Sequence, residues 1–195
     1  MERLGSLRRG GRPNAAIAWA SVGALVAVAV ASALAGDLPW SLLALALVAP
    51  VAAPAVAERD PTTTLPWPIA LGSAAAVAGP WVGVPTEPAG YLAVAALATA
   101  AVVDLVAFTS VELSRGFAAA SVALTSMAAQ SVWTVAQFYA DAWLGTGYLA
   151  SKAELQWDLV AATAVAVAAG VAFLWYAGRF ESPRSTEGSA RPEST

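Results

Sequence analysis

A row of polar side chains interrupts an otherwise apolar stretch of this sequence and is the first place where chemistry could reside. With 100° of rotation per residue, its members fall within an arc of about 80° on one helix face. They are Ser126, Gln130, Thr134, Gln137 and Asp141, in or just before SVWTVAQFYADAWLGT. Because only the aspartate of this row ionises, the row favours hydrogen bonding over acid–base chemistry.

Three interpretations of this polar row compete. The first is hydrogen bonding between helices, which contributes on average well under about 1 kcal/mol per contact in membrane proteins. The second is the lining of a polar cavity or solute path, and the third is a site for a reaction. All three place the row inside a helical bundle, because amides and hydroxyls that face lipid lack partners.

Two further carboxylates could carry function. Asp104 lies well inside the apolar segment AVVDLVAF, and a carboxylate within a membrane span is a hypothesis of function by default. The alternative is structural, with a local water or Arg115 as its partner. Asp158 opens another apolar segment, where an acidic side chain also suits helix capping and the helix dipole.

The residue inventory excludes several kinds of site. The chain has no cysteine and no histidine, which excludes disulfides, thiolate or imidazole metal sites, cysteine nucleophiles and histidine acid–base chemistry. The single lysine, Lys152, falls in a predicted loop rather than in a buried position for a Schiff base. There is no Gly-x-Ser-x-Gly motif and no pair of intramembrane aspartates. We therefore predict no cofactor, no metal and no catalytic residue.

The elements that must position these side chains follow from composition. Hydrophobic residues make up 58% of the chain and charged residues 12%, against about a quarter charged in soluble domains. About 20 apolar residues in a helix cross a hydrocarbon layer of about 30 Å. A soluble all-α protein is the disfavoured alternative. We predict an all-α membrane bundle of six transmembrane helices, at about 14–35, 40–57, 67–85, 90–110, 117–139 and 158–178.

Two of these segments are interrupted. The segment at 40–57 holds Pro50 and Pro54, and the one at 67–85 holds proline and glycine at several positions. A four-helix protein with 40–85 lying in the membrane interface is the alternative. The charged loop ERDPTTTLP at 58–66 argues against it, since that loop needs water on one side.

The arginines predict how the chain is oriented. Basic residues in short loops stay cytoplasmic, and six crossings put both termini on one side. The tail at 1–13, the loops after the second and fourth segments and the tail at 179–195 hold all nine arginines. We therefore predict a multi-pass protein of the cell membrane with cytoplasmic termini, an uncleaved first helix and a disordered polar tail at 179–195.

Aromatic residues near the predicted segment ends are typical of a belt at the headgroup layer. They are Trp40, Trp67, Trp81, Trp143, Trp157, Trp175, Tyr148 and Tyr176. The lipid bilayer is accordingly the expected partner, with no nucleic acid. Protein partners are not identified by the sequence, and a homo-oligomer is left open.

From about 104 to 170 the chain resembles the YjdF-type family of uncharacterised polytopic membrane proteins. The resemblance rests on Asp141, on Leu144-Gly145-Thr146 and on Trp157-Asp158-Leu159, in VWTVAQFYADAWLGT and QWDLVAATAVAVAAG. A more distant likeness to VanZ-like membrane proteins rests on the helix that begins near Asp158. Neither family supplies an established activity.

The departures from that family bear on mechanism. Its members tend to carry glutamates where this chain has Thr134 and Gln137, and an acidic residue where it has Ala162. The resemblance therefore implies that a proton relay or cation site built from those carboxylates is lost or reduced here. What remains is the hydrogen-bonding geometry of a polar interior.

Three functions follow as hypotheses. The first is a non-catalytic integral membrane protein that acts as a scaffold or through partners or lipid. The alternative is a small-solute or ion permease with a polar path between the fourth, fifth and sixth helices. Its candidate polar interior is Asp104, Gln130, Thr134, Gln137, Asp141 and Asp158. A membrane enzyme acting on lipids ranks third.

Overall fold

The computed structural model describes residues 11–108, 114–148 and 152–179, and every regular element in these ranges is a helix. The expected tails, apart from residues 11–13 and 179, lie outside the described residues. The predicted all-α class is thus confirmed for the described part of the chain. The elements are α1 Arg12–Leu34, α2 Leu38–Glu58, α3 Trp67–Ala78, the 3-10 turn η2 Gly79–Val82, α4 Thr86–Phe108, α5 Arg115–Leu144 and α6 Lys152–Gly178.

Local sequence explains where several helices start and stop. The Asp37 side chain accepts a hydrogen bond from the Trp40 amide at 3.1 Å and caps the start of α2. Ser114 does the same for α5 through the Phe117 amide at 3.3 Å. Helix α5 ends at Gly145, whose φ of +67° is a left-handed conformation that glycine adopts without strain.

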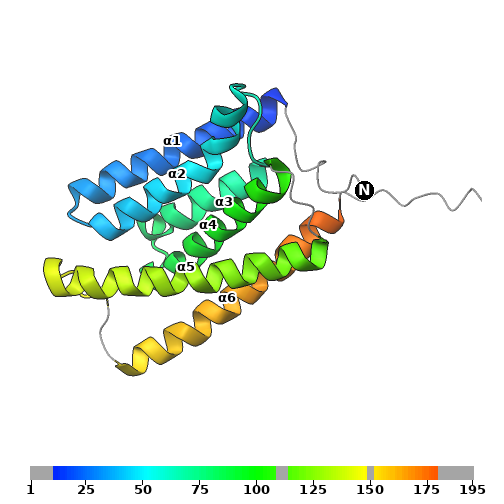
Figure 1. Cartoon of the computed structure of the whole chain (residues 1–195). Coiled ribbons are helices and arrows are strands. Elements are labelled where there is room, and N and C mark those ends of the chain that lie inside the picture. The colour runs from blue at the N-terminus through cyan, green and yellow to red at the C-terminus, as the bar shows by residue number, and fades with distance from the viewer. Residues whose placement is uncertain (1–10, 109–113, 149–151, 180–195) are drawn as a thin grey trace, which may run out of the picture.

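The six helices alternate in direction, and α1 begins at the end of the bundle where α6 finishes (Figure 1). We call this the basic end, because Arg12, Arg59 and Arg179 lie there. The opposite end carries the turn between α1 and α2 and the connection between α5 and α6. The Tyr148 hydroxyl donates a hydrogen bond to Asp37 between these two connections.

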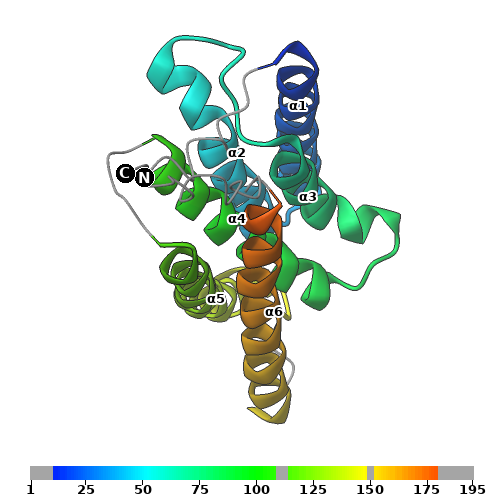
Figure 2. The same cartoon turned by 90° about the vertical axis from the view of Figure 1, so that its right-hand side faces the viewer.

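Helices α1 to α4 form one group, and α5 and α6 lie along one side of it (Figures 1 and 2). Four helices are long and apolar enough to cross a membrane within the described ranges: α1, α2, Thr86–Val106 of α4 and Gln156–Gly178 of α6. Helix α5 is longer than any of these, but the polar row lowers its hydropathy. Helix α3 has only 12 residues, about 18 Å of rise.

The predicted helix over 67–85 is wrong at its C-terminal end. The α-helix stops at Ala78, and Gly79–Val82 continues as a 3-10 turn. Pro80 explains the break, because it has no amide proton for the helical ladder. The carbonyl of Val77 instead accepts a hydrogen bond from the Trp40 indole at 3.1 Å. By contrast, α2 runs unbroken through Pro50 and Pro54.

Small residues fill the interior and large apolar residues face outward. The core is dominated by alanine, including Ala44 and Ala93, each 0% exposed. Leu34 is 84% exposed, Val132 71% and Trp157 73%. Larger side chains such as Leu25 and Leu47 are also buried, but the exposure of so many large apolar residues differs from a water-soluble helical bundle, which keeps most of them inside.

Helices α5 and α6 touch closely at one point and separate elsewhere. A Cβ added to Gly170 would lie 2.9 Å from the Ala119 carbonyl oxygen and 3.4 Å from the Ala123 Cβ, so only glycine fits this crossing. From there toward the start of α6 the two helices diverge (Figure 1). This divergence opens a space that α4 borders on the third side.

Candidate functional site

The space between α4, α5 and α6 contains a hollow of about 330 Å³ that we call the polar cavity. Four of the six residues predicted for the polar interior line it: Gln130, Thr134, Gln137 and Asp158. The helical spacing of the first three turns them to one face of α5, as the sequence indicated. Of these three, Gln130 is buried, and Thr134 and Gln137 are partly buried.

Some side chains of the polar row form hydrogen bonds and others do not. The Thr134 hydroxyl donates to the Gln130 carbonyl at 3.1 Å, and the Ser126 hydroxyl to the Val122 carbonyl at 2.7 Å. These bonds stay within α5 and join no second helix. The Gln130 side chain is 8% exposed and, among the described residues, makes no hydrogen bond. Its amide therefore faces the cavity with its bonding capacity unused.

Asp158 is held by a residue far away in the chain. The Tyr91 hydroxyl of α4 donates to Asp158 Oδ1 at 2.7 Å across the cavity wall. Helix α6 already begins at Lys152, so Asp158 lies in its second turn. The sequence suggested that Asp158 caps α6. Its position in the second turn is too late for a cap, and its side chain instead ties α6 to α4.

Asp141 organises the turn after α5 and does not line the polar cavity. Its Oδ1 accepts hydrogen bonds from the Thr146 hydroxyl at 2.6 Å and the Tyr148 amide at 2.7 Å. Gly145 and Gly147, both with positive φ, let the chain fold back on the helix end. The turn thereby places the Tyr148 ring at the mouth of the cavity.

Tyr148 closes a hydrogen-bonded link between distant parts of the chain. Its hydroxyl donates to Asp37, whose same oxygen also caps α2. Burial, this hydrogen bond and the negative charges of Asp37 and Asp141 raise the pKa of the Tyr148 hydroxyl above its ordinary value. The residue therefore acts as a neutral hydrogen-bond donor.

A second hollow of about 470 Å³, which we call the vestibule, adjoins the polar cavity at the end of the bundle. It shares Thr86, Glu87, Gln137 and Tyr148 with the cavity and adds Asp37. Because Thr86 and Glu87 are exposed, the vestibule connects the cavity with the surface. The end that holds these carboxylates and Asp141 is called the acidic end; Lys152 begins α6 there as well.

Asp104 lies apart from the cavity. It follows Tyr91 by 13 positions on α4, about 20 Å along the helix axis. Its Oδ1 is buried and has no hydrogen-bond partner among the described residues. The structure therefore separates Asp104 from the other five candidates.

Two aromatic residues of the site, Trp133 and Tyr91, were missed from sequence. Trp133 is 8% exposed and packs edge-on between Trp40 and Tyr148, with ring centroids 6.2 and 6.4 Å away. The inward position of Trp133 could have been predicted from the sequence, because helical spacing puts Trp133 about 20° from Ser126, on the face of the polar row. Nothing in the sequence indicated a role for Tyr91, because its hydrogen-bond partner Asp158 is 67 positions away.

The aromatic belt is wrong for two of its expected members. Trp40 is 2% exposed, and its indole donates to Val77 inside the bundle. Tyr148 is half-buried at the cavity mouth. Other members are exposed as a belt requires, with Trp143 78% and Trp175 62% exposed.

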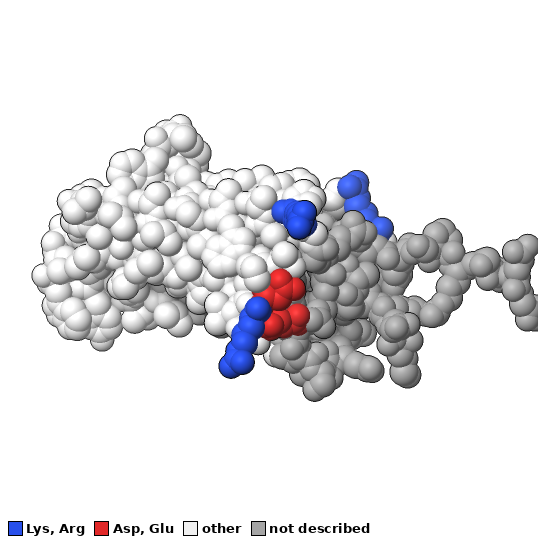
Figure 3. Space-filling view, turned by 90° about the horizontal axis from the view of Figure 1, so that it is seen from above, with Lys and Arg blue, Asp and Glu red and all other residues white. Residues whose placement is uncertain are grey.

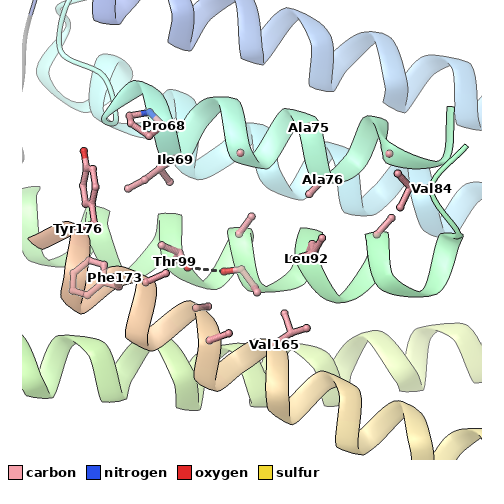
Figure 4. Close-up of a pocket in the computed structure, with 18 residues that line it drawn as sticks. Pro68, Ile69, Ala75, Ala76, Val84, Leu92, Thr99, Val165, Phe173 and Tyr176 are labelled. Carbon is pink, nitrogen blue, oxygen red and sulfur yellow. Dashed lines mark hydrogen bonds between the residues drawn. The ribbon is translucent and has the colours of Figure 1, made fainter. Parts of the chain in front are cut away.

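A separate apolar groove of about 620 Å³ runs between α3, α4 and α6 (Figure 4). Ile69, Leu92, Val165 and Phe173 are among the side chains that line it. The Thr99 hydroxyl bonds to its own helix at the Ala95 carbonyl, 2.7 Å away. The groove thus offers contact to an apolar chain and little hydrogen bonding.

Charge is distributed unevenly over the molecule. In the face shown by Figure 3, the charged side chains gather toward the basic end and the long flank carries neither sign. Among the described residues that line the polar cavity, Glu87 and Asp158 are acidic and none is basic. In the part of the chain that the structure describes, no three Asp or Glu side chains form a group able to hold a metal ion.

Comparison with known proteins gives one match. The model of a domain of unknown function, DUF8268, matches residues 2–64, which contain α1, α2 and most of the loop that follows. This match does not include any residue that lines the polar cavity, and it does not extend to residues 104–170, for which a YjdF-type resemblance was predicted. Neither a curated protein nor a solved structure matches the chain.

Proposed function

We propose that the chain is a multi-pass integral protein of the cell membrane with six crossings and cytoplasmic termini. Four helices have the length and apolarity to cross, and α5 has the length, with its polar face turned inward. Together α3 and η2 rise about 26 Å, close to the hydrocarbon thickness of about 30 Å. The arginines at one end of the bundle support the sidedness.

The exposed apolar side chains support lipid as the surrounding medium. Large outward residues such as Leu34 and Val132 would form a continuous apolar surface in water, which monomeric soluble proteins avoid. Small residues at the interior, such as Gly170 at the α5–α6 crossing, allow the close helix approach that membrane bundles use.

Reporter fusions test this topology. Fusions after residues 62, 114 and 195 are expected to report cytoplasmic, and fusions after 87 and 150 to report the outer side. The chain should also sediment with vesicles and resist extraction by high salt. An outer signal after residue 195, or a monodisperse protein in buffer without detergent, would refute the proposal.

Within the membrane we propose a non-catalytic role: the chain binds a small solute in the polar cavity. The observation that carries this proposal is the nearly buried Gln130 amide, which faces the cavity without a partner. The Gln130 amide is not among the buried side-chain polar atoms that lack a partner in the described residues, so it reaches the surface of the cavity and is available to hydrogen-bond a bound solute. A scaffold that acts only through its outer surface has no need of such a group.

A thermal-stability screen tests solute binding. The full chain in detergent is heated with neutral, anionic and cationic small solutes, and a solute at 100 times its Kd should stabilise it by about 2.7 kcal/mol. Ala162→Leu narrows the cavity, so stabilisation by the same solute should disappear. If no class of solute stabilises the chain, the solute-binding proposal is wrong.

The second candidate is a small-solute or ion permease. The cavity extends along α5 from Gln137 to Met127, about 15 Å and half of the hydrocarbon thickness. Asp104 does not line the cavity and lies farther along α4, toward the basic end. In liposomes, flux that Asp104→Asn and Gln137→Ala both abolish would support transport. Flux equal to that of empty liposomes would exclude the permease and would leave solute binding as the proposed function.

The apolar groove adds a lipid contact to the same proposal. Its lining between α3 and α6 suits an acyl chain, since Thr99 is already bonded within its helix. The resemblance of residues 104–170 to the YjdF-type family remains a prediction beside these proposals.

A further inference from the structure

We propose that the solute of the polar cavity is a small organic cation, an ammonium group on an apolar body, that enters from the acidic end. This inference rests on the solute-binding function proposed above and adds the chemical class of the ligand. Charge, aromatic surface and unused hydrogen-bonding groups each support it.

The charges along the entry favour a cation. Asp37 lines the vestibule, Glu87 lies where the vestibule meets the cavity, and Asp158 lies in the cavity. Among the described residues that line either hollow there is no lysine or arginine. A negative lining with low-dielectric walls concentrates cations and repels anions.

Asp158 can face a cation directly. Its Oδ1 accepts the Tyr91 hydroxyl, and within the described part of the chain its Oδ2 accepts no hydrogen bond. The Tyr91 bond fixes the carboxylate in the wall, so one oxygen is oriented and the other remains for a ligand. Asp158 therefore supplies a held negative charge inside the cavity.

The aromatic lining favours an ammonium group with an organic body. Trp133 is the largest of these rings, and its edge contacts with Trp40 and Tyr148 hold it in place. Tyr91 and Tyr148 line the same cavity. The faces of such rings attract cations, most strongly where water is excluded, and also contact apolar groups. A hydrated metal ion would make no use of these rings.

The size and the remaining polar groups narrow the class. A volume of about 330 Å³ is at the small end of ligand sites, which span about 300–1,000 Å³. Gln130, nearly buried and unbonded among the described residues, lines the cavity with an amide oxygen whose partial negative charge attracts an ammonium group. This oxygen is a second observation, independent of the carboxylates, that indicates a ligand.

The test uses three probes that share a phenyl ring, two of them equal in shape, with the full chain in detergent. Phenyltrimethylammonium is cationic, tert-butylbenzene is its neutral isostere, and benzoate is anionic. Titration calorimetry should show binding of the cation, with the isostere at least about tenfold weaker and benzoate not bound. This comparison uses the wild-type chain alone, so it does not depend on how any variant folds.

Two aspartate variants locate the site. Asp158→Asn should weaken phenyltrimethylammonium binding by about tenfold, which corresponds to about 1.4 kcal/mol. Asp60→Asn removes the same charge from an exposed turn at the basic end and should leave the affinity unchanged. Circular dichroism before titration confirms that both variants are folded.

Each outcome decides the proposal. Equal binding of the cation and its isostere, tighter binding of benzoate, or no effect of Asp158→Asn overturns the cationic class. Failure of phenyltrimethylammonium to bind also overturns it. If neutral solutes still stabilise the chain in the thermal screen, the solute-binding function survives that failure. If none does, both proposals fall.

Discussion

The two ends of the bundle are built differently. At the basic end, Asn14 makes three hydrogen bonds: its Nδ2 donates to Thr64 Oγ1 at 2.8 Å and to the Leu65 carbonyl at 3.0 Å, and its Oδ1 accepts from the Trp67 amide at 2.8 Å. These bonds tie α1 to the loop before α3. At the acidic end, tyrosine–carboxylate pairs surround a hollow instead.

The difference shows which end is structural and which is suited to binding. Asn14 bonds to two backbone groups and one hydroxyl of the segment Thr64–Trp67. The pairs Tyr91–Asp158 and Tyr148–Asp37 link distant elements beside the two hollows while their carboxylates retain acceptor capacity. We therefore expect substitutions at the basic end to affect mainly stability, and those at the acidic end to affect mainly ligand binding.

The largest expected effect is at the basic end. Asn14→Ala removes three hydrogen bonds and should lower the free energy of unfolding by about 3 kcal/mol. Unfolding by a denaturing detergent measures the loss. Ser21→Ala on the same helix is the control, because that hydroxyl bonds only to the Ile17 carbonyl of α1. Equal losses in the two variants would mean that the basic end is not fixed by Asn14.

The next effect is at the point from which the cavity opens. Gly170→Ala places a Cβ 2.9 Å from the Ala119 carbonyl oxygen, which should cost about 1–3 kcal/mol despite a better helix propensity. Gly23→Ala meets nothing within 4 Å and should gain up to about 1 kcal/mol. The same unfolding assay compares them. Stabilisation by both changes would contradict the tight crossing.

A smaller effect is expected at the cavity mouth. Tyr148→Phe removes the hydrogen bond to Asp37 and should cost about 1.5 kcal/mol, because the acceptor is charged. A double-mutant cycle with Asp37→Asn measures the coupling between the two side chains. Tyr139→Phe, at an exposed ring, serves as the control. A coupling energy of zero would mean that the hydrogen bond between Tyr148 and Asp37 contributes nothing to stability.

The smallest effect is on the ionisation of Tyr148. Because its pKa is raised in the folded chain, Tyr148 should remain protonated at pH values just above about 10, where ordinary tyrosines ionise. The stability it contributes is complete below the unfolded pKa and is lost as pH rises through the folded pKa. Ultraviolet titration of wild type and Tyr148→Phe should therefore show equal phenolate absorbance just above pH 10. An excess in the wild type would contradict the raised pKa.

The local features of the fold were predictable, since they depend on neighbours in the chain. Apolar runs gave the helices, and a helical period turned Gln130, Thr134 and Gln137 to one face. The early end of α3 was harder to predict. Pro80 indicated an interruption, but not that α-helix would give way to a 3-10 turn.

The long-range features were not predictable from one sequence. The bond between Tyr91 and Asp158 depends on how α4 and α6 pack, and the sequence assigned Asp158 to capping instead. Trp40 and Tyr148 have the composition of belt residues, and only the packing shows that they face inward. The separation of Asp104 from the cavity is likewise a result of tertiary arrangement.

The broken α3 has a consequence for biogenesis. Helix α3 has only 12 residues before the 3-10 turn, so carbonyl groups at its C-terminal end lack helical hydrogen-bond partners. A segment with such unpaired carbonyls does not partition alone into the proposed bilayer. The Val77 carbonyl finds its donor only on α2, which is synthesised earlier. We therefore expect the translocon to release α2 and α3 into lipid together, as one hairpin, and replacement of the Trp40 indole to trap that hairpin at the ribosome-bound stage.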